Sequence, residues 1–123
     1  MGFGAGFSYN GYSGSSGSGS SGSGSSIAYS RTSVTSTITS SVDDLILAVS
    51  ASSALDIRLP SASAFVNGAC FVIKDEAGNA DDYNITIKTT EPDKIDGAGS
   101  IDLQSPFGAV NIYSNGIDKF FVY

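Results

Sequence analysis

Apolar and polar residues alternate with a period of two along much of the chain after residue 26. The clearest case is the segment 55–59, which Pro60 ends, and the segments 85–87 and 110–112 show the same alternation. Successive side chains of a strand point to opposite faces of its sheet, so this pattern predicts half-buried strands. We therefore expect an all-β domain in which no helix is longer than about two turns.

The segment 71–88 predicts a β-hairpin on which the rest of the domain is organised. Two alternating runs, 71–74 and 85–88, flank the polar, Gly-containing connection 75–82. Residues of this kind tolerate a positive φ or form hydrogen bonds with their own backbone, as turn residues do. The connection is too long for a two-residue turn, so the expected hairpin has a longer loop.

The segment 42–49, VDDLILAV, fits two kinds of structure. Ser41 followed by Asp44 matches a helix capping box, and the run is long enough for a short helix. The surrounding segments are rich in β-branched residues, and this context favours a strand.

Turn residues separate the expected strands. Asn67-Gly68 and Asn115-Gly116 are turn pairs, and Glu91, Pro92 and Asp93 form a third turn signal. Short strands joined in this way predict a compact antiparallel β-sandwich or barrel-like domain over residues 27–123.

Residues 1–26 differ sharply from the rest, because they contain no charged side chain and end in a Gly/Ser tract. Such a tract behaves as a flexible coil, since it buries too little apolar area to offset the entropy lost on ordering. The tract fits either a native spacer or an added linker. The segment before it fits either a disordered terminus or an arm that anchors the domain to a partner through its aromatic rings. Those rings are Phe3, Phe7, Tyr9 and Tyr12.

Composition argues against several classes of function. The formal net charge is −6, which opposes binding to nucleic acid and to anionic lipid. The chain has no His, so the usual general base and the commonest metal ligand are missing, and we expect neither an enzyme nor a cofactor. No apolar run approaches the roughly 20 residues of a membrane helix. Cys70 is the only cysteine and is expected to be a small core residue.

The acidic residues offer two further candidate sites. The connection 75–82 collects carboxylate and amide oxygens of the kind that Ca²⁺ prefers. Its spacing is not that of an EF-hand, and solvated turn residues explain the composition more simply, so we expect no metal there. Asp43 and Asp44 would face opposite sides of a strand and could not act as a catalytic pair.

The C-terminal segment 117–123 predicts a last strand, and its final stretch 119–123, KFFVY, is apolar on both faces. A strand of this kind is either central in a sandwich or covered by a second subunit. Oligomerisation would bury the apolar surface that one small domain leaves exposed. We therefore expect Phe120, Phe121 and Tyr123 at contacts between subunits.

Residues 42–123 also carry a series of short motifs in a fixed order. They are the segments 54–60, 71–80, 84–87, 95–97, 107–110 and 113–116, together with Gly68 and the aromatic C-terminal strand. The series resembles a β module that recurs in tailed-bacteriophage virion proteins, among them tail fibres, tailspike adaptors, head fibres and capsid decoration proteins. Phe120 departs from the module, which often carries Trp near this position.

The resemblance implies a structural protein that is commonly trimeric and has no active site. We expect a homotrimer on the surface of the virion, attached through its N-terminal arm to the major capsid protein or another virion protein. In this role it would be a capsid decoration, cement or head-fibre protein. The alternative is a short tail-fibre or tail-tip module that binds a glycan or a protein of the host surface.

Overall fold

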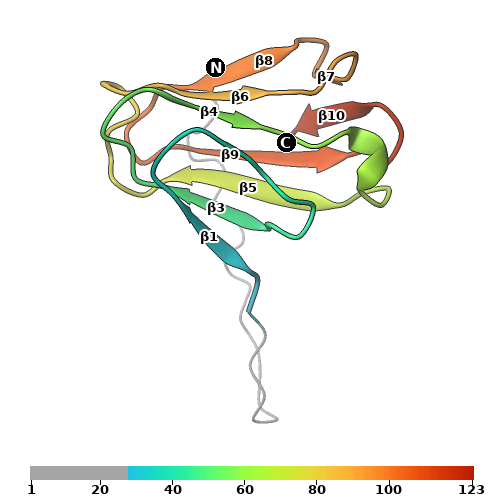
Figure 1. Ribbon diagram of the computed structural model, residues 1–123, viewed down its shortest axis with the longest axis horizontal. Helices are drawn as coiled ribbons and strands as arrows, with labels where there is room; N and C mark the ends of the chain where they lie inside the picture. Colours follow the sequence, from blue (N-terminus) through green and yellow to red (C-terminus); the bar gives the residue numbers. More distant parts are fainter. Residues whose placement is uncertain (1–27) are drawn as a thin grey trace, which may run out of the picture.

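The computed structural model describes residues 28–123, which form two β-sheets packed face to face (Figure 1). Sheet A has the strand order β1-β3-β5-β9-β10-β7, and sheet B has the order β2-β4-β6-β8. Among the described residues the only helix is the 3₁₀ turn η2 (Ala62–Ala64), so the expected all-β class is confirmed. The strands are β1 (Arg31–Val34), β2 (Ile38–Thr39), β3 (Ile46–Val49), β4 (Leu55–Arg58), β5 (Cys70–Asp75), β6 (Ile85–Lys88), β7 (Lys94–Ile95), β8 (Ser100–Leu103), β9 (Ala109–Ser114) and β10 (Lys119–Val122).

The described part of the chain begins after the expected N-terminal arm. Phe3, Phe7, Tyr9 and Tyr12 lie outside it, and their role as anchoring groups stays a prediction. Within residues 28–123, no helix is long and apolar enough to cross a membrane.

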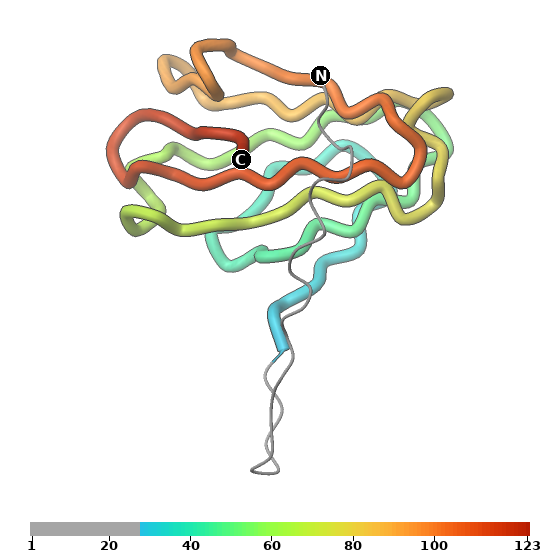
Figure 2. Tube along the Cα trace, turned by 180° about the vertical axis from the view of Figure 1, so that it is seen from behind, coloured from blue at the N-terminus to red at the C-terminus, as the bar shows by residue number. Residues whose placement is uncertain are grey.

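Successive strands from β1 to β9 alternate between the two sheets. In sheet A, β1, β3 and β5 pair in parallel, and in sheet B, β2, β4 and β6 do the same. Antiparallel pairs join β8 to β6, and β9 to both β5 and β10. Figure 2 shows β9 and β10 side by side near the C-terminus. Both sheets are therefore mixed, and the prediction of an antiparallel sandwich is wrong about how the strands pair.

The predicted hairpin over 71–88 is also wrong. β5 belongs to sheet A and β6 to sheet B, and the connection 76–84 crosses from one sheet to the other (Figure 1). Each strand does have one buried and one more exposed face, as the alternation predicts. Alternation reports only which side chains are buried. It is the same whether two strands are neighbours in one sheet or face each other across a core.

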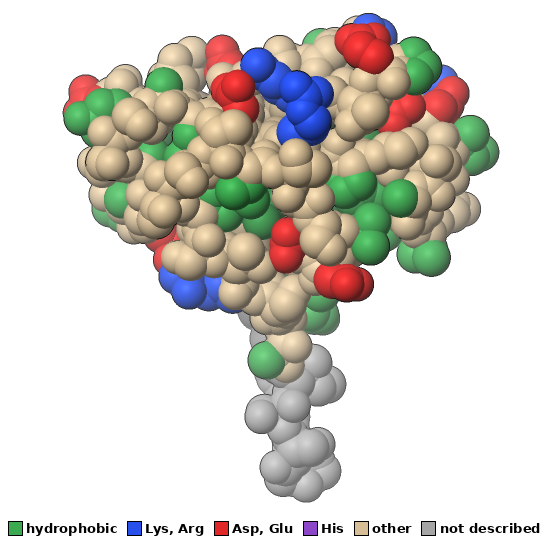
Figure 3. Space-filling view, in the orientation of Figure 1, with side chains coloured by type: hydrophobic (Ala, Val, Ile, Leu, Met, Phe, Trp, Pro, Cys, Tyr) green, Lys and Arg blue, Asp and Glu red, His purple; other side chains and the backbone are tan. Residues whose placement is uncertain are grey.

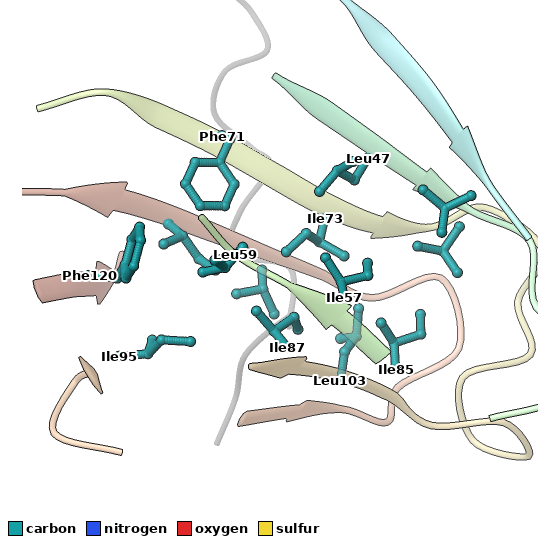
Figure 4. Close-up of a cluster of buried hydrophobic side chains, with 14 of the residues drawn as sticks. Leu47, Ile57, Leu59, Phe71, Ile73, Ile85, Ile87, Ile95, Leu103 and Phe120 are labelled. Atoms are coloured by element: carbon teal, nitrogen blue, oxygen red, sulfur yellow. The ribbon is translucent and has the colours of Figure 1, made fainter. Parts of the chain in front are cut away.

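The inward-facing side chains of both sheets form one apolar core (Figure 4). At one end of it, three rings from distant parts of the chain contact one another. The rings of Phe65 and Phe71 are stacked with centroids 5.4 Å apart, and the Phe120 ring is nearly perpendicular to both, with its centroid 5.7 and 6.2 Å from theirs. Such edge-to-face pairs add to the gain from burial. The other labelled core residues are Leu47, Ile57, Leu59, Ile73, Ile85, Ile87, Ile95 and Leu103.

The ambiguous segment 42–49 forms a strand, β3, preceded by a turn. Only one of the two hydrogen bonds of a capping box is present, because the Ser41 hydroxyl accepts the N–H of Asp43 at 3.1 Å instead of that of Asp44. The Ser41 N–H donates to Asp44 Oδ2 at 2.8 Å, and the Asp44 N–H donates to the Ser41 carbonyl at 3.0 Å. The capping residues therefore close one turn, and the chain then enters sheet A instead of continuing as a helix.

Two predicted turns lie side by side at one end of the sandwich. Gly68 and Gly116 both have a positive φ, 87° and 75°, which confirms the Asn-Gly signals. The Gly68 N–H donates to the Ser114 carbonyl at 2.8 Å. A Cβ on Gly116 would lie 2.8 Å from the Asn67 nitrogen, so glycine is required there for space as well as for φ.

Candidate functional site

The outer face of sheet B is polar, and its side chains interact with one another. Lys88 Nζ lies 3.0 Å from Asp56 Oδ2 on the neighbouring strand. The Thr86 hydroxyl donates to Asp102 Oδ1 at 2.8 Å. Figure 3 shows a group of Lys and Arg side chains beside acidic ones over the layer that contains β4 and β6. We call this surface the polar face: Thr39, Asp56, Arg58, Thr86, Lys88, Ser100 and Asp102.

The outer face of sheet A carries aromatic and aliphatic side chains instead. The Tyr113 ring has its centroid 5.4 Å from that of Phe121 and 5.7 Å from that of Tyr123. On the other side of β9, Cys70 lies directly opposite Tyr113 in the ladder. We call this surface the aromatic face: Ile46, Cys70, Val72, Tyr113, Phe121 and Tyr123.

The aromatic face crosses the sheet from its β1 edge to β10. Along one row, Arg31 pairs with Ile46, Ile46 with Val72, and Val72 with Asn111. The Tyr123 N–H donates to the Asn111 carbonyl at 3.0 Å, which continues the row to the end of the chain. Residues far apart in the sequence therefore form one continuous surface.

Charged side chains limit the aromatic face at one corner. Arg31 Nε donates to Glu76 Oε2 at 3.1 Å, and Arg31 Nη2 forms a second bond with Glu76 Oε1. This hydrogen bonding holds the pKa of Glu76 below its ordinary value, and the charges of Arg31 and Lys74 lower it further, while slight burial opposes the shift. The Lys74 ammonium donates to the Phe107 carbonyl. The corner is therefore an ion-paired rim beside the apolar part of the face.

The three residues predicted at subunit contacts have different positions. The Phe120 side chain is fully buried in the core of its own subunit. Phe121 is half-buried on the outer side of β10, and Tyr123 is 54% exposed. Only Phe121 and Tyr123 are therefore placed where a second subunit could reach them without opening the core. Their contact with one stays a prediction.

The expectation that Cys70 is a core residue is wrong. Its side chain is exposed, and its Sγ donates to the Gly68 carbonyl at 3.3 Å. Phe71 and Ile73 point inward, so the neighbouring positions of the strand must point outward. The same rule places Tyr113 outward, because Ile112 is buried. The alternation of inward and outward side chains, applied strictly from Phe71 and Ile112, would have predicted that Cys70 and Tyr113 face outward.

The acidic connection after β5 is organised by a buried carboxylate. Asp75 Oδ1 accepts the N–H of Gly78 at 3.0 Å, and Oδ2 accepts those of Ala80 and Phe107, each at 3.0 Å. Asp75 is fully buried and ties two loops together through their backbones. No group of three or more His, Cys, Asp or Glu residues in 28–123 could hold a metal ion.

Phe107 is the most unusual residue at this end of the sandwich. Its φ is 59°, and 59% of the residue is exposed. Its ring lies against Gly78, where an added Cβ would be only 2.4 Å from a ring carbon. The bonds from the Phe107 N–H and carbonyl to Asp75 and Lys74 hold this backbone in place.

Comparison with protein-family models and with curated protein sequences finds no match for this chain. The chemistry that the aromatic face offers is contact by burial. Aromatic rings supply a large apolar area at low entropic cost and provide much of the energy of protein contacts.

Proposed function

We propose that this chain is a structural protein of a bacteriophage virion. It forms a homotrimer on the particle surface and is attached to the major capsid protein or another virion protein through its N-terminal arm. Its role is that of a capsid decoration, cement or head-fibre protein. The observation that carries the proposal is the contrast between the two outer faces, one aromatic and one polar with paired charges.

The aromatic face supports the subunit contact. Monomeric proteins rarely expose a contiguous apolar patch larger than a few hundred Å², and larger patches mark places where another molecule packs. Tyr113, Phe121 and Tyr123 form a cluster of adjacent rings on the outer side of neighbouring strands. The polar face remains toward solvent in this arrangement, because its charges already have partners within the sheet.

The series of motifs in residues 42–123 supports the virion and the trimer, and the aromatic N-terminal segment supports the mode of attachment. Burying one aromatic side chain contributes roughly 1.5–3 kcal/mol. Ordering the Gly-rich backbone costs about 1–2 kcal/mol per residue. One arm should therefore bind weakly, and three arms on one trimer should bind stably, because the first contact raises the effective concentration of the others.

The test uses virus particles assembled without this chain. Purified full-length protein is added, the particles are sedimented, and the bound copies are counted. We expect saturable binding in multiples of three, and a large loss of occupancy when residues 1–12 are deleted while circular dichroism stays unchanged. Equal occupancy without residues 1–12 would contradict attachment through the arm. Binding to host cells without binding to particles would favour the tail-fibre alternative.

A further inference from the structure

The aromatic face and the N-terminal segment of the same chain have matching chemistry. The face presents rings and aliphatic side chains on the outer side of sheet A. The segment 3–12 contains Phe and Tyr rings among small residues and carries no charge. Packing one against the other would therefore bury apolar area without removing the water around any charged group of the segment.

The described chain also begins at the β1 edge of sheet A, where the row of outward-facing residues starts. The Ile46 N–H donates to the Ser30 carbonyl at 2.9 Å, so the segment before β1 already lies beside the first residue of the aromatic face. Tyr29, directly before Ser30, is 67% exposed. The chain thus enters the sheet at one end of the row that leads through Ile46 and Val72 towards Tyr123.

The length of the intervening chain fits the distance to be spanned. β10 is four strand positions from β1 in sheet A. At about 4.8 Å per strand, the span is about 19 Å. Residue 12 precedes residue 28 by 16 positions (28 − 12 = 16). A Gly/Ser-rich coil of that length has a root-mean-square end-to-end distance of about 20–24 Å, so it reaches the face without being stretched.

We propose that, in the free chain, the segment 3–12 packs on the aromatic face of its own domain. A tethered segment acts at an effective concentration of the order of millimolar, whereas a second copy in a dilute solution is present at about micromolar. For equal intrinsic affinity, the chain's own segment therefore occupies the face first. Where the proposed function also holds, capture of the arm by the particle uncovers the face for neighbouring copies, so that attachment and trimer formation are coupled.

Cys70 provides a direct reporter of whether the face is covered. It is the only cysteine of the chain, it is exposed, and it lies opposite Tyr113 in the β5–β9 ladder. A segment packed on Tyr113 and Phe121 would shield its thiol from a reagent in solution. The rate at which Cys70 reacts with an aromatic disulfide reagent therefore measures the uncovered fraction of the face.

The experiment compares the full-length chain with a full-length variant in which Phe3, Phe7, Tyr9 and Tyr12 are all replaced by Ser. If the face binds the free segment with a dissociation constant of about 0.1 mM, a millimolar effective concentration protects the thiol about tenfold. We expect the variant to react about tenfold faster than the natural chain. Tyr83→Ser serves as the control, because it removes an exposed ring from a loop outside both the arm and the face.

The rates are measured over a hundredfold range of protein concentration, with circular dichroism to verify the fold of each variant. Protection that is the same at every concentration and is lost in the four-Ser variant supports the proposal. Equal rates in the natural chain and the four-Ser variant overturn it. Protection that disappears on dilution also overturns it, because a second copy would then be the occupant. Particle binding is a separate measurement, so failure here leaves the attachment test unaffected.

Discussion

The two outer faces of the sandwich are built by the same backbone pattern and have opposite chemistry. On sheet B, the outward positions pair with one another, as Asp56 does with Lys88 and Thr86 with Asp102. On sheet A, the outward positions of β9 and β10 cluster their rings. A surface whose polar groups bind one another has little to gain from a partner. A surface of adjacent rings gains from being covered.

The largest effect should come from comparing two adjacent rings of β10. Phe120 is fully buried, whereas Phe121 points to the outer face. Phe120→Ala should lower the free energy of unfolding by about 3–5 kcal/mol, because it leaves a cavity among Phe65 and Phe71. Phe121→Ala should lower it by about 1 kcal/mol or less. Urea unfolding measures both values, and equal losses would contradict the assignment of inner and outer faces.

A second comparison sets a buried carboxylate against one on the polar face. Asp75→Ala leaves three backbone N–H groups without their acceptor, each at a cost of about 1–3 kcal/mol when it stays dry. Asp56→Ala removes one exposed ion pair, worth about 1 kcal/mol or less. We expect the first variant to be unfolded or strongly destabilised and the second to be close to the natural chain in thermal unfolding. A stable Asp75→Ala domain would show that water replaces the carboxylate.

A third comparison places the same new charge on each outer face. Phe121→Asp puts a carboxylate in the proposed subunit contact, where burying it unpaired should weaken assembly at least about a hundredfold. Ser100→Asp adds the same charge to the polar face, opposite Lys88, and should leave assembly unchanged. Cross-linking of the bound copies on particles measures the fraction that is trimeric. Equal loss of trimers in both variants would point to net charge instead of the face.

The strands were predictable because burial leaves a local signature in the sequence. Leu55 and Ile57 are buried on β4, and Val110 and Ile112 on β9, as their alternation predicts. The neighbours of each strand were not predictable from that signature. Whether a connection such as 76–84 turns back within one sheet or crosses to the other depends on contacts that the loop makes after folding.

The candidate surface was predictable only in part, for a similar reason. The outward position of Tyr123 follows from its place at the end of an apolar strand, and that of Cys70 follows from the inward phase of Phe71. The role of Asp75 does not follow from any local pattern. Its carboxylate accepts a hydrogen bond from the N–H of Phe107, which lies 32 positions further along the chain and meets it only in the folded domain.

The smallest effect concerns the charged corner beside the aromatic face. The bonds from Arg31 lower the pKa of Glu76, so the folded chain binds fewer protons than the unfolded chain at pH values between the two pKa values. The pair's contribution to stability is therefore fully present above the ordinary glutamate pKa of about 4.3. It is lost as the pH falls through the lower pKa of the folded state. Because both side chains are partly exposed to water, the contribution is small and weakens with added salt.

Glu76→Gln should therefore destabilise the domain slightly at neutral pH and less at about pH 3, because the contribution of the pair shrinks as the pH falls below the ordinary glutamate pKa. The measurement is urea unfolding of both proteins at the two pH values, at low salt. Glu91→Gln is the matched control, because it removes the same charge and leaves the Arg31 pair intact. A stability difference that persists undiminished at acid pH would mean that Glu76 acts by packing against the sheet. The charged corner would then belong to the contact surface that the aromatic face presents, instead of forming its solvated rim.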